Sequence, residues 1–285
     1  MILSYSARQA KRLVKESVIT SLASVATIMG SPSRRRDRIL PPTTRAKFLK
    51  TIPMNGAVLE LGPFDVPQMV GDRVAYFDVL DQGALRVRAV HEGRDPTGCP
   101  VIDYVSDSGD LSIVPGPFDT VFSAHVIEHQ HDLIQHLADV HRLLKPGGRY
   151  YMVVPDKRYC FDHFLKLTTI EDVVAMTDQG PAANVERAIY DVYHNLAHND
   201  CLKHWLGLHG ERLTTPATAK AEYETAIARY RDGNYRDVHA CHFTPSSFQE
   251  ILTTLYEADR SALRSIVVHD TNFADLEFFA VLEKS

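Results

Sequence analysis

The sequence has no long hydrophobic run and no strong excess of charge of either sign. Because no run of 18 apolar residues occurs in the 285, we expect no stable membrane span. Lys and Arg number 31 against 36 Asp and Glu, and a net charge of -5 argues against a nucleic-acid-binding protein held by a global positive field. The hydrophobic share of 45% and charged share of 24% are those of a globular chain, which excludes overall disorder. The length predicts one large domain or two small ones.

Cysteine is scarce, and its spacing contains no CxxC pair. A chain of this length does not need disulfides to hold a core, so we expect reduced thiols and a cytoplasmic setting. The four cysteines are Cys99, Cys160, Cys201 and Cys241.

The first 45 residues are predicted to form an N-terminal amphipathic helix and a basic linker, punctuated by Pro41 and Pro42. Residues 18–29 are apolar enough to imitate a signal peptide. However, Glu16 lies beside them, and no small-x-small cleavage site precedes the basic residues 34–36. We expect the helix to pack on the domain, with docking on a membrane or partner as the alternative, and the segment permits homodimer contacts.

Short apolar runs predict the strands of an α/β sheet. The first run closes on Gly62 and Pro63, as a buried parallel strand does. A helix is predicted from residue 133 to 144, because its apolar side chains recur at helical spacing behind a capping Asp132. The predicted strands of this part are 57–61, 73–78, 101–105, 118–123 and 150–154.

Beyond the fifth strand the alternation of predicted strands and helices stops, and it resumes near the end of the chain. Residues 156–243 read as a helical insertion, and Thr244-Pro245 then starts a helix that runs through Leu255. The strands 264–269 and 277–282 are joined closely, so they should be antiparallel. The prediction is a doubly wound, seven-stranded, Rossmann-like α/β sheet with an antiparallel last strand. Its core would comprise residues 46–155 and 244–285, and the insertion would form a substrate lid over the strand ends that bind ligands.

Residues at the predicted strand ends suit a nucleoside ligand. Gly62 allows close backbone approach, helped by the N-terminus of the helix expected to follow it. Asp78 ends the second strand 16 residues later, where a carboxylate can accept both hydroxyls of a ribose; Asp81 is the alternative.

Two further strand ends carry polar side chains. Asp107 follows the third strand and can accept from an exocyclic amine, a role for which Asp103 and Asp110 compete. Ser123 and His125 stand at the tip of the fourth strand, at the mouth of the expected cleft.

Several of these segments together resemble a known family. The chain is similar to class I S-adenosylmethionine-dependent methyltransferases over about residues 55–155, and by element order through 244–285. The resemblance implies a sheet of order 3-2-1-4-5-7-6, S-adenosylmethionine as cofactor, and methyl transfer. The segments that carry it are Glu60-Leu61-Gly62, Asp78, Phe118-Asp119, the HVIEH run from His125 to His129, and the LKPGG run from Leu144 to Gly148.

The glycine loop departs from the family pattern, because Gly62 is followed by Pro63, Phe64 and Asp65 rather than by further glycines. The resemblance assigns cofactor binding to Glu60, Gly62 and Pro63, with Asp65 near the amino-acid end. The departure leaves open a catalytically degenerate binding or scaffold protein. A nicotinamide-dependent oxidoreductase is a third hypothesis, against which the lack of GxGxxG argues.

Histidine is the residue best suited to act as a base near neutral pH, and the chain has 14. His239 and His125 are the candidate catalytic residues if the acceptor must lose a proton. We prefer His239, because the insertion should carry acceptor specificity. His194 and His198 share a helix face that can bind a metal, and His239 and His242 could add ligands, but without HExxH we predict no metal site.

The charged and aromatic run 156–162 follows the fifth strand and suits a polar substrate such as a sugar. It is similar to uncharacterised bacterial methyltransferases associated with glycan or natural-product pathways. The expected function is therefore cytoplasmic methyl transfer to a hydroxyl or amine of a small polar acceptor, with no nucleic-acid partner.

Overall fold

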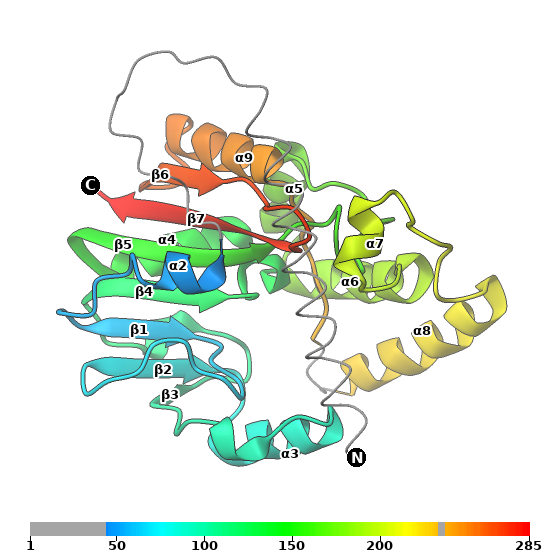
Figure 1. The fold of residues 1–285 in the computed structure, drawn as a ribbon, viewed down its shortest axis with the longest axis horizontal. Coiled ribbons are helices and arrows are strands. Elements are labelled where there is room, and N and C mark those ends of the chain that lie inside the picture. Colours follow the sequence, from blue (N-terminus) through cyan, green and yellow to red (C-terminus); the bar gives the residue numbers. More distant parts are fainter. Residues whose placement is uncertain (1–43, 233–236) are drawn as a thin grey trace, which may run out of the picture. The chain divides into compact units, whose positions relative to one another are not determined.

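A computed structural model describes residues 44–232 and 237–285, within the compact unit that spans residues 42–285. Residues 1–43 of the predicted N-terminal helix and linker lie outside the described residues. The described part is built around one mixed sheet with helices packed against it (Figure 1).

The sheet has seven strands in the order β3-β2-β1-β4-β5-β7-β6. Strands β1 to β5 pair in parallel, and β7 runs antiparallel to both β5 and β6. This confirms the predicted fold class and strand order. The strands are β1 (Val58–Leu61), β2 (Val74–Asp78), β3 (Tyr104–Val105), β4 (Phe118–Ala124), β5 (Leu144–Pro155), β6 (Leu263–His269) and β7 (Glu277–Lys284).

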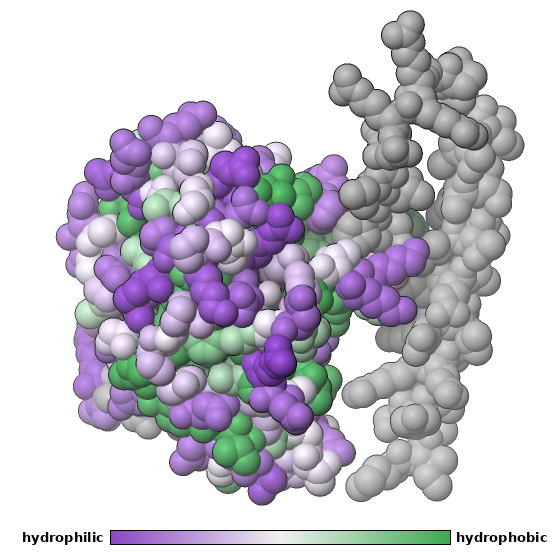
Figure 2. All heavy atoms as spheres, turned by 90° about the vertical axis from the view of Figure 1, so that its left-hand side faces the viewer, coloured by the Kyte–Doolittle hydropathy of each residue, from purple (hydrophilic) through white to green (hydrophobic). Residues whose placement is uncertain are grey.

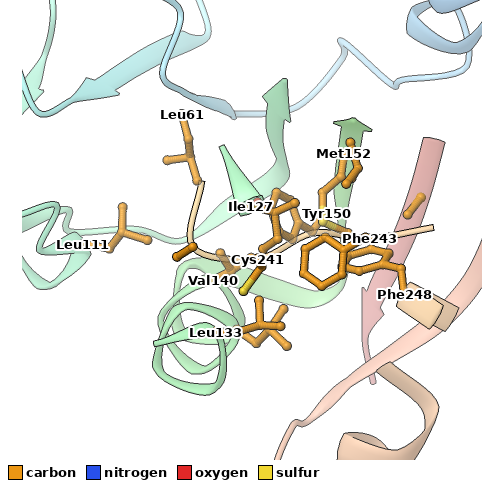
Figure 3. Packing of buried hydrophobic residues seen from close by; sticks show 14 of the residues in the cluster. Leu61, Leu111, Ile127, Leu133, Val140, Tyr150, Met152, Cys241, Phe243 and Phe248 are labelled. Atoms are coloured by element: carbon orange, nitrogen blue, oxygen red, sulfur yellow. The ribbon is translucent and has the colours of Figure 1, made fainter. Parts of the chain in front are cut away.

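The larger core lies on one face of the sheet. Alternate strand residues such as Leu59, Met152 and Phe278 point to that face, as the two-residue period of a strand requires. The helices α4 (Leu133–Leu143) and α9 (Pro245–Glu257) cover them with apolar side chains. Figure 3 shows residues of this cluster, including Tyr150, Phe243 and Phe248, which gather beside the strands.

The opposite face carries a smaller core that is covered by α2 (Arg45–Leu49). Thr44 caps this short helix, and its Phe48 is fully buried. The Phe48 ring stacks on that of Phe279, with 4.7 Å between ring centroids. This contact fixes Arg45 above the start of β7, which matters for the site described below.

The remaining helices lie outside these two cores or extend them. In Figure 1, α6, α7 and α8 lie beyond the carboxyl ends of the parallel strands, on the right of the view. The segment that contains them therefore covers the edge of the sheet where ligands are expected. These elements are α3 (Gln82–His91), η2 (Pro96–Gly98), η3 (Leu111–Ile113), η4 (Ile127–His129), α5 (Ile170–Gln179), α6 (Pro181–Asn195), α7 (Cys201–Trp205) and α8 (Pro216–Arg231).

Two local predictions need correction. The helix expected directly after Gly62 is wrong, because the described residues 62–73 form turns and bends only. Pro63 and Pro67 lack amide hydrogens and restrict the residue before each of them, and the Glu60 carboxylate accepts the amides of the loop instead. The third strand is also shorter than predicted, with only Tyr104 and Val105 paired to β2.

The face at the amino ends of the parallel strands is a mixed surface. Figure 2 views this side of the molecule and shows hydrophilic and hydrophobic residues interspersed. A hollow of about 270 Å³ lies on it, lined in part by Asp119, Lys145 and Tyr151. Among the described helices, none is both long and apolar enough to cross a membrane.

Candidate functional site

The HVIEH run forms the turn that leaves the carboxyl end of β4. His125 follows the last strand residue and adopts a left-handed backbone conformation, with φ of 56°. This conformation is uncommon outside glycine and reverses the chain into η4, where Glu128 and His129 follow. One short segment thus places three ionisable side chains at the edge of the sheet where the ligand was expected.

His125 lies between two carboxylates. Its Nε2 is 3.1 Å from Glu277 Oε2, and its Nδ1 is 3.4 Å from Glu128 Oε1. Burial lowers the pKa of His125, but the two carboxylates outweigh burial and raise that pKa to about 9. The two carboxylates therefore favour the protonated imidazole, while Nη2 of Arg45, which can only donate, lies 3.0 Å from the same Nε2.

Glu277, the first residue of β7, contacts both His125 and Arg45 of α2. Arg45 binds it through two hydrogen bonds, of 2.9 Å from Nε and 2.5 Å from Nη2. Burial alone would raise the pKa of Glu277, but His125 and Arg45 lower it to about 2. Neither Arg45 nor Glu277 was predicted from the sequence, because they lie 232 residues apart and leave no local spacing signal.

His239, the preferred catalytic candidate, is held by a carboxylate from the start of the insertion. Its Nδ1 lies 2.7 Å from Asp162 Oδ2, and both side chains are buried. Burial lowers the pKa of His239, yet the net shift is upward because of the charge and hydrogen bond of Asp162. If Nδ1–H donates to Asp162, the Nε2 lone pair of neutral His239 is left available.

The two predicted catalytic histidines line the same pocket. Its volume is about 470 Å³, within the range of small-molecule sites, and it lies at the carboxyl ends of β4 and β5 and the start of β7. The structure thus brings together two residues that lie 114 positions apart in the chain. The lining residues are Arg45, His125, Pro155, Cys160, Phe161, Asn199, His239, Asp275, Leu276 and Glu277.

The predicted ribose acceptor, Asp78, lies at the end of β2 and is mostly buried. One of its carboxylate oxygens accepts from the Leu80 amide at 3.0 Å. Burial raises the pKa of Asp78 to about 6, against the opposing effects of the Leu80 and Val79 amides and of Arg88. Its competitor Asp81 instead caps α3 by accepting from the Ala84 amide.

The end of β1 is shaped for a close approach of backbone. Gly62 has a φ of +65°, and a Cβ there would lie only 2.8 Å from a methyl carbon of Val126. Only glycine avoids both the strained conformation and this clash. The buried Pro63 follows, and Phe64 is covered by the guanidinium groups of Arg88 and Arg94.

Other predicted cofactor residues make contacts within the protein. Both carboxylate oxygens of Glu60 accept from the Gln68 amide, and one of them also accepts from Met69. Asp65 accepts from Arg94 at 2.7 Å, while its Oδ1 is buried without a hydrogen bond. Ser123 is buried, with its hydroxyl 2.8 Å from that of Tyr150.

Asp107 is exposed just beyond β3. Its two competitors have structural duties, since Asp103 accepts from the Tyr76 amide and Asp110 caps η3. Asp107 is therefore the acid of this stretch best placed to meet a ligand.

Asp237 connects the helices that follow β2 and β4. Its carboxylate binds Arg88 on α3 and lies 3.0 Å from Nδ1 of His129 on η4. Because α3 follows β2 and η4 follows β4, the bridge spans the carboxyl end of β1.

Two groups of side chains among the described residues have donor atoms close enough to hold a metal ion. The first contains His163, His204 and His209, whose rings are nearly parallel and in which Nδ1 of His204 and Nδ1 of His209 already lie at hydrogen-bond distance, 3.1 Å apart. The second is described further below and consists of Glu128, His129 and His239. The sequence had singled out other histidines, such as His194, which stacks on Tyr190.

Residues 69–152 match a family described as a methyltransferase domain. This confirms the predicted resemblance to class I methyltransferases, in which S-adenosylmethionine is the cofactor. The strand ends fit that cofactor. Asp78 offers a carboxylate where the ribose is expected, and Gly62 has no side chain to keep a ligand away from its backbone.

Solved structures similar to this chain have low sequence identity to it. A methyltransferase from Aquifex aeolicus is 12% identical, with coverage of 80% of this chain and 82% of the other and a TM-score of 0.37. A putative methyltransferase from Listeria monocytogenes is 14% identical, covering 84% and 97% with a TM-score of 0.43. The CcbJ methyltransferase from Streptomyces caelestis is 15% identical, covering 89% and 100% with a TM-score of 0.38. A search among curated proteins found no match.

Proposed function

We propose that this chain transfers a methyl group from S-adenosylmethionine to a hydroxyl or amine of a small polar acceptor, such as a sugar or a natural product. The observation that carries the proposal is the pocket of about 470 Å³ that both His125 and His239 line. When bound, the cofactor supplies an electrophilic methyl group on a sulfonium. The protein's own contribution is alignment and exclusion of water.

The cofactor side of the proposal uses the strand ends. Asp78 would accept the ribose hydroxyls, and Asp107 would accept the exocyclic amine of the adenine. The backbone at Gly62 and Pro63 would lie along the methionine part.

Three further predicted residues would support the cofactor site indirectly, by holding its neighbouring groups in place. Glu60 holds the loop after β1 through its backbone amides, and Asp65 fixes Arg94 near the amino-acid end. Ser123 fixes the Tyr150 hydroxyl under the tip of β4.

The acceptor side of the proposal uses the two histidines differently. His239 would activate the acceptor group, because Asp162 holds its Nδ1 and leaves its Nε2 lone pair available. His125, a cation between Glu128 and Glu277, would position the acceptor rather than take its proton. Arg45, Asn199 and Asp275 add polar groups to the lining, which suits an acceptor with several hydrogen-bonding groups.

The proposed domains divide cofactor binding from acceptor binding. Residues 46–155 and 244–285 would form the cofactor-binding core, and residues 156–243 the substrate lid. A cytoplasmic location and a homodimer stay predictions, to be checked by cell fractionation and by light scattering.

A catalytically degenerate scaffold is the second candidate, and one observation favours it. Gly62 is followed by a loop held by Glu60 rather than by a helix with free amides at its N-terminus. Binding of the demethylated cofactor without turnover on any acceptor would support the scaffold.

The test is transfer of a labelled methyl group to a panel of sugars, nucleotide sugars and hydroxylated natural products. We expect turnover with the wild type and loss of at least 100-fold in kcat for His239→Ala, with cofactor affinity unchanged. His194→Ala is the matched control, because His194 lies on α6 with Nδ1 bonded to its own helix carbonyl at Tyr190. Equal turnover by His239→Ala and wild type would contradict the role of His239.

A further inference from the structure

Glu128 is a fully buried carboxylate whose two oxygens have no hydrogen-bond partner. Leaving a buried charge without compensation is unfavourable, so its surroundings matter. Three imidazoles approach its Oε1. The distances are 3.4 Å from Nδ1 of His125, 3.9 Å from Nε2 of His129 and 3.8 Å from Nε2 of His239.

Two of these rings have a hydrogen-bond acceptor close to their Nδ1 atom. His129 Nδ1 lies 3.1 Å from the Val238 carbonyl oxygen and 3.0 Å from an Asp237 carboxylate oxygen. His239 Nδ1 lies 2.7 Å from Asp162. If each Nδ1–H donates outward, the neutral form of each ring presents its Nε2 lone pair to Glu128. Metal-binding histidines are held in this way, with the second ring nitrogen bonded to a carboxylate or a backbone carbonyl.

A carboxylate oxygen and two such lone pairs make a donor set that suits a cation. The rings of His129 and His239 stand at 90° to each other, so their lone pairs can meet at one point without stacking. One divalent cation would satisfy all three donors at once.

We propose that Glu128, His129 and His239 bind one divalent cation at the carboxyl end of β4. Metal–ligand bonds of about 2.1 Å place donor atoms roughly 3.0–3.4 Å apart, so the two distances from Glu128, 3.9 and 3.8 Å, need to close by less than about 1 Å. Two histidines and one carboxylate suit first-row cations such as Mn²⁺, Co²⁺ or Zn²⁺.

The site would leave coordination positions open toward the pocket, which His239 also lines. Oxygen atoms of the acceptor would fill them, and two neighbouring hydroxyls would fill two positions together. The inferred acceptor class is therefore a compound with vicinal hydroxyl groups, which is a deepening of the proposed function and rests on it.

With its Nε2 bound to the cation, His239 would act as a metal ligand in place of the direct role proposed above, and the cation would lower the pKa of the bound hydroxyl. That hydroxyl releases its proton to solvent, its oxygen forms the bond to the methyl carbon, and the carbon–sulfur bond of the sulfonium breaks to leave a neutral thioether.

The test uses the full chain, stripped with a chelator and titrated with Co²⁺ alone, and follows visible ligand-field absorption. We expect one Co²⁺ per chain and at least about 100-fold weaker binding for His129→Ala. Folding of each variant is checked by thermal unfolding. His209→Ala, from the other histidine group, is the matched control and should bind as the wild type does.

Methyl transfer measured with and without chelator separates this inference from the proposed function. Transfer that chelator abolishes and added metal restores supports both. Transfer that continues with chelator, or Co²⁺ binding lost in His209→Ala rather than His129→Ala, overturns the metal site and leaves the proposed function standing. Stoichiometric Co²⁺ binding that needs His129, without transfer to any acceptor, supports the metal site and contradicts the proposed function.

Discussion

Replacing Asp78 by Asn tests the cofactor side of the proposal with little structural disturbance. Asp78 ends β2, and one of its oxygens accepts from the Leu80 amide at 3.0 Å. Asn has the same shape and keeps a carbonyl oxygen for Leu80. The substitution therefore removes mainly the negative charge that would accept both ribose hydroxyls.

The expected loss follows from the strength of hydrogen bonds to a charged group. Such bonds contribute about 1.5–3 kcal/mol each. Asn retains one acceptor, so a net loss of about 2 kcal/mol is expected, which corresponds to a roughly 30-fold weaker Kd. Isothermal titration calorimetry with S-adenosylhomocysteine measures it directly. Asp81→Asn is the control, because Asp81 caps α3 and Asn caps helices equally well.

The pH dependence of binding gives a second readout for the same residue. The pKa of Asp78 is raised to about 6 by burial and by Asp237, while the Leu80 and Val79 amides and Arg88 oppose the rise. Because the ionised form accepts the ribose hydroxyls, wild-type affinity should weaken as the pH falls through about 6. Asp78→Asn should lack this slope. A variant that binds within twofold of the wild type, together with a wild type whose affinity does not change with pH, would refute the ribose assignment.

Two further predictions concern stability. Burial raises the pKa of Glu60 from 4.5 to about 7, so between these values the folded chain keeps a proton that the unfolded chain has released. The free energy of unfolding should therefore fall by up to about 3 kcal/mol as the pH rises through this window, and Glu60→Gln should flatten urea-denaturation midpoints measured across it. Phe48→Ala removes a fully buried ring stacked on Phe279 and should cost about 3–5 kcal/mol in the same assay, whereas a loss below 1 kcal/mol would contradict the packing of α2 on the sheet.

The sheet could be predicted from the sequence because its signals are local. Short apolar runs marked the buried strands, and the spacing of Leu133, Leu137 and Val140 marked α4. The resemblance then supplied the strand order that the structure shows.

The site could be predicted only in part, because its decisive contacts are distant in sequence. Asp162 and His239 are 77 residues apart, and Arg45 and Glu277 are 232 apart, so no spacing rule connects them. The missing helix after Gly62 did leave a local signal. Pro67, four residues beyond Pro63, disfavours a helical conformation at Val66.

The central claim is that an adenosyl cofactor lies across the carboxyl ends of β1, β2 and β4 with its sulfur toward the histidine-lined pocket. A crystal structure of the chain with bound S-adenosylhomocysteine tests it most directly. The account predicts ribose hydroxyls on Asp78 and the sulfur facing the space between His125 and His239. A ligand bound elsewhere, or a chain that takes up no ligand at saturating concentration, would contradict it.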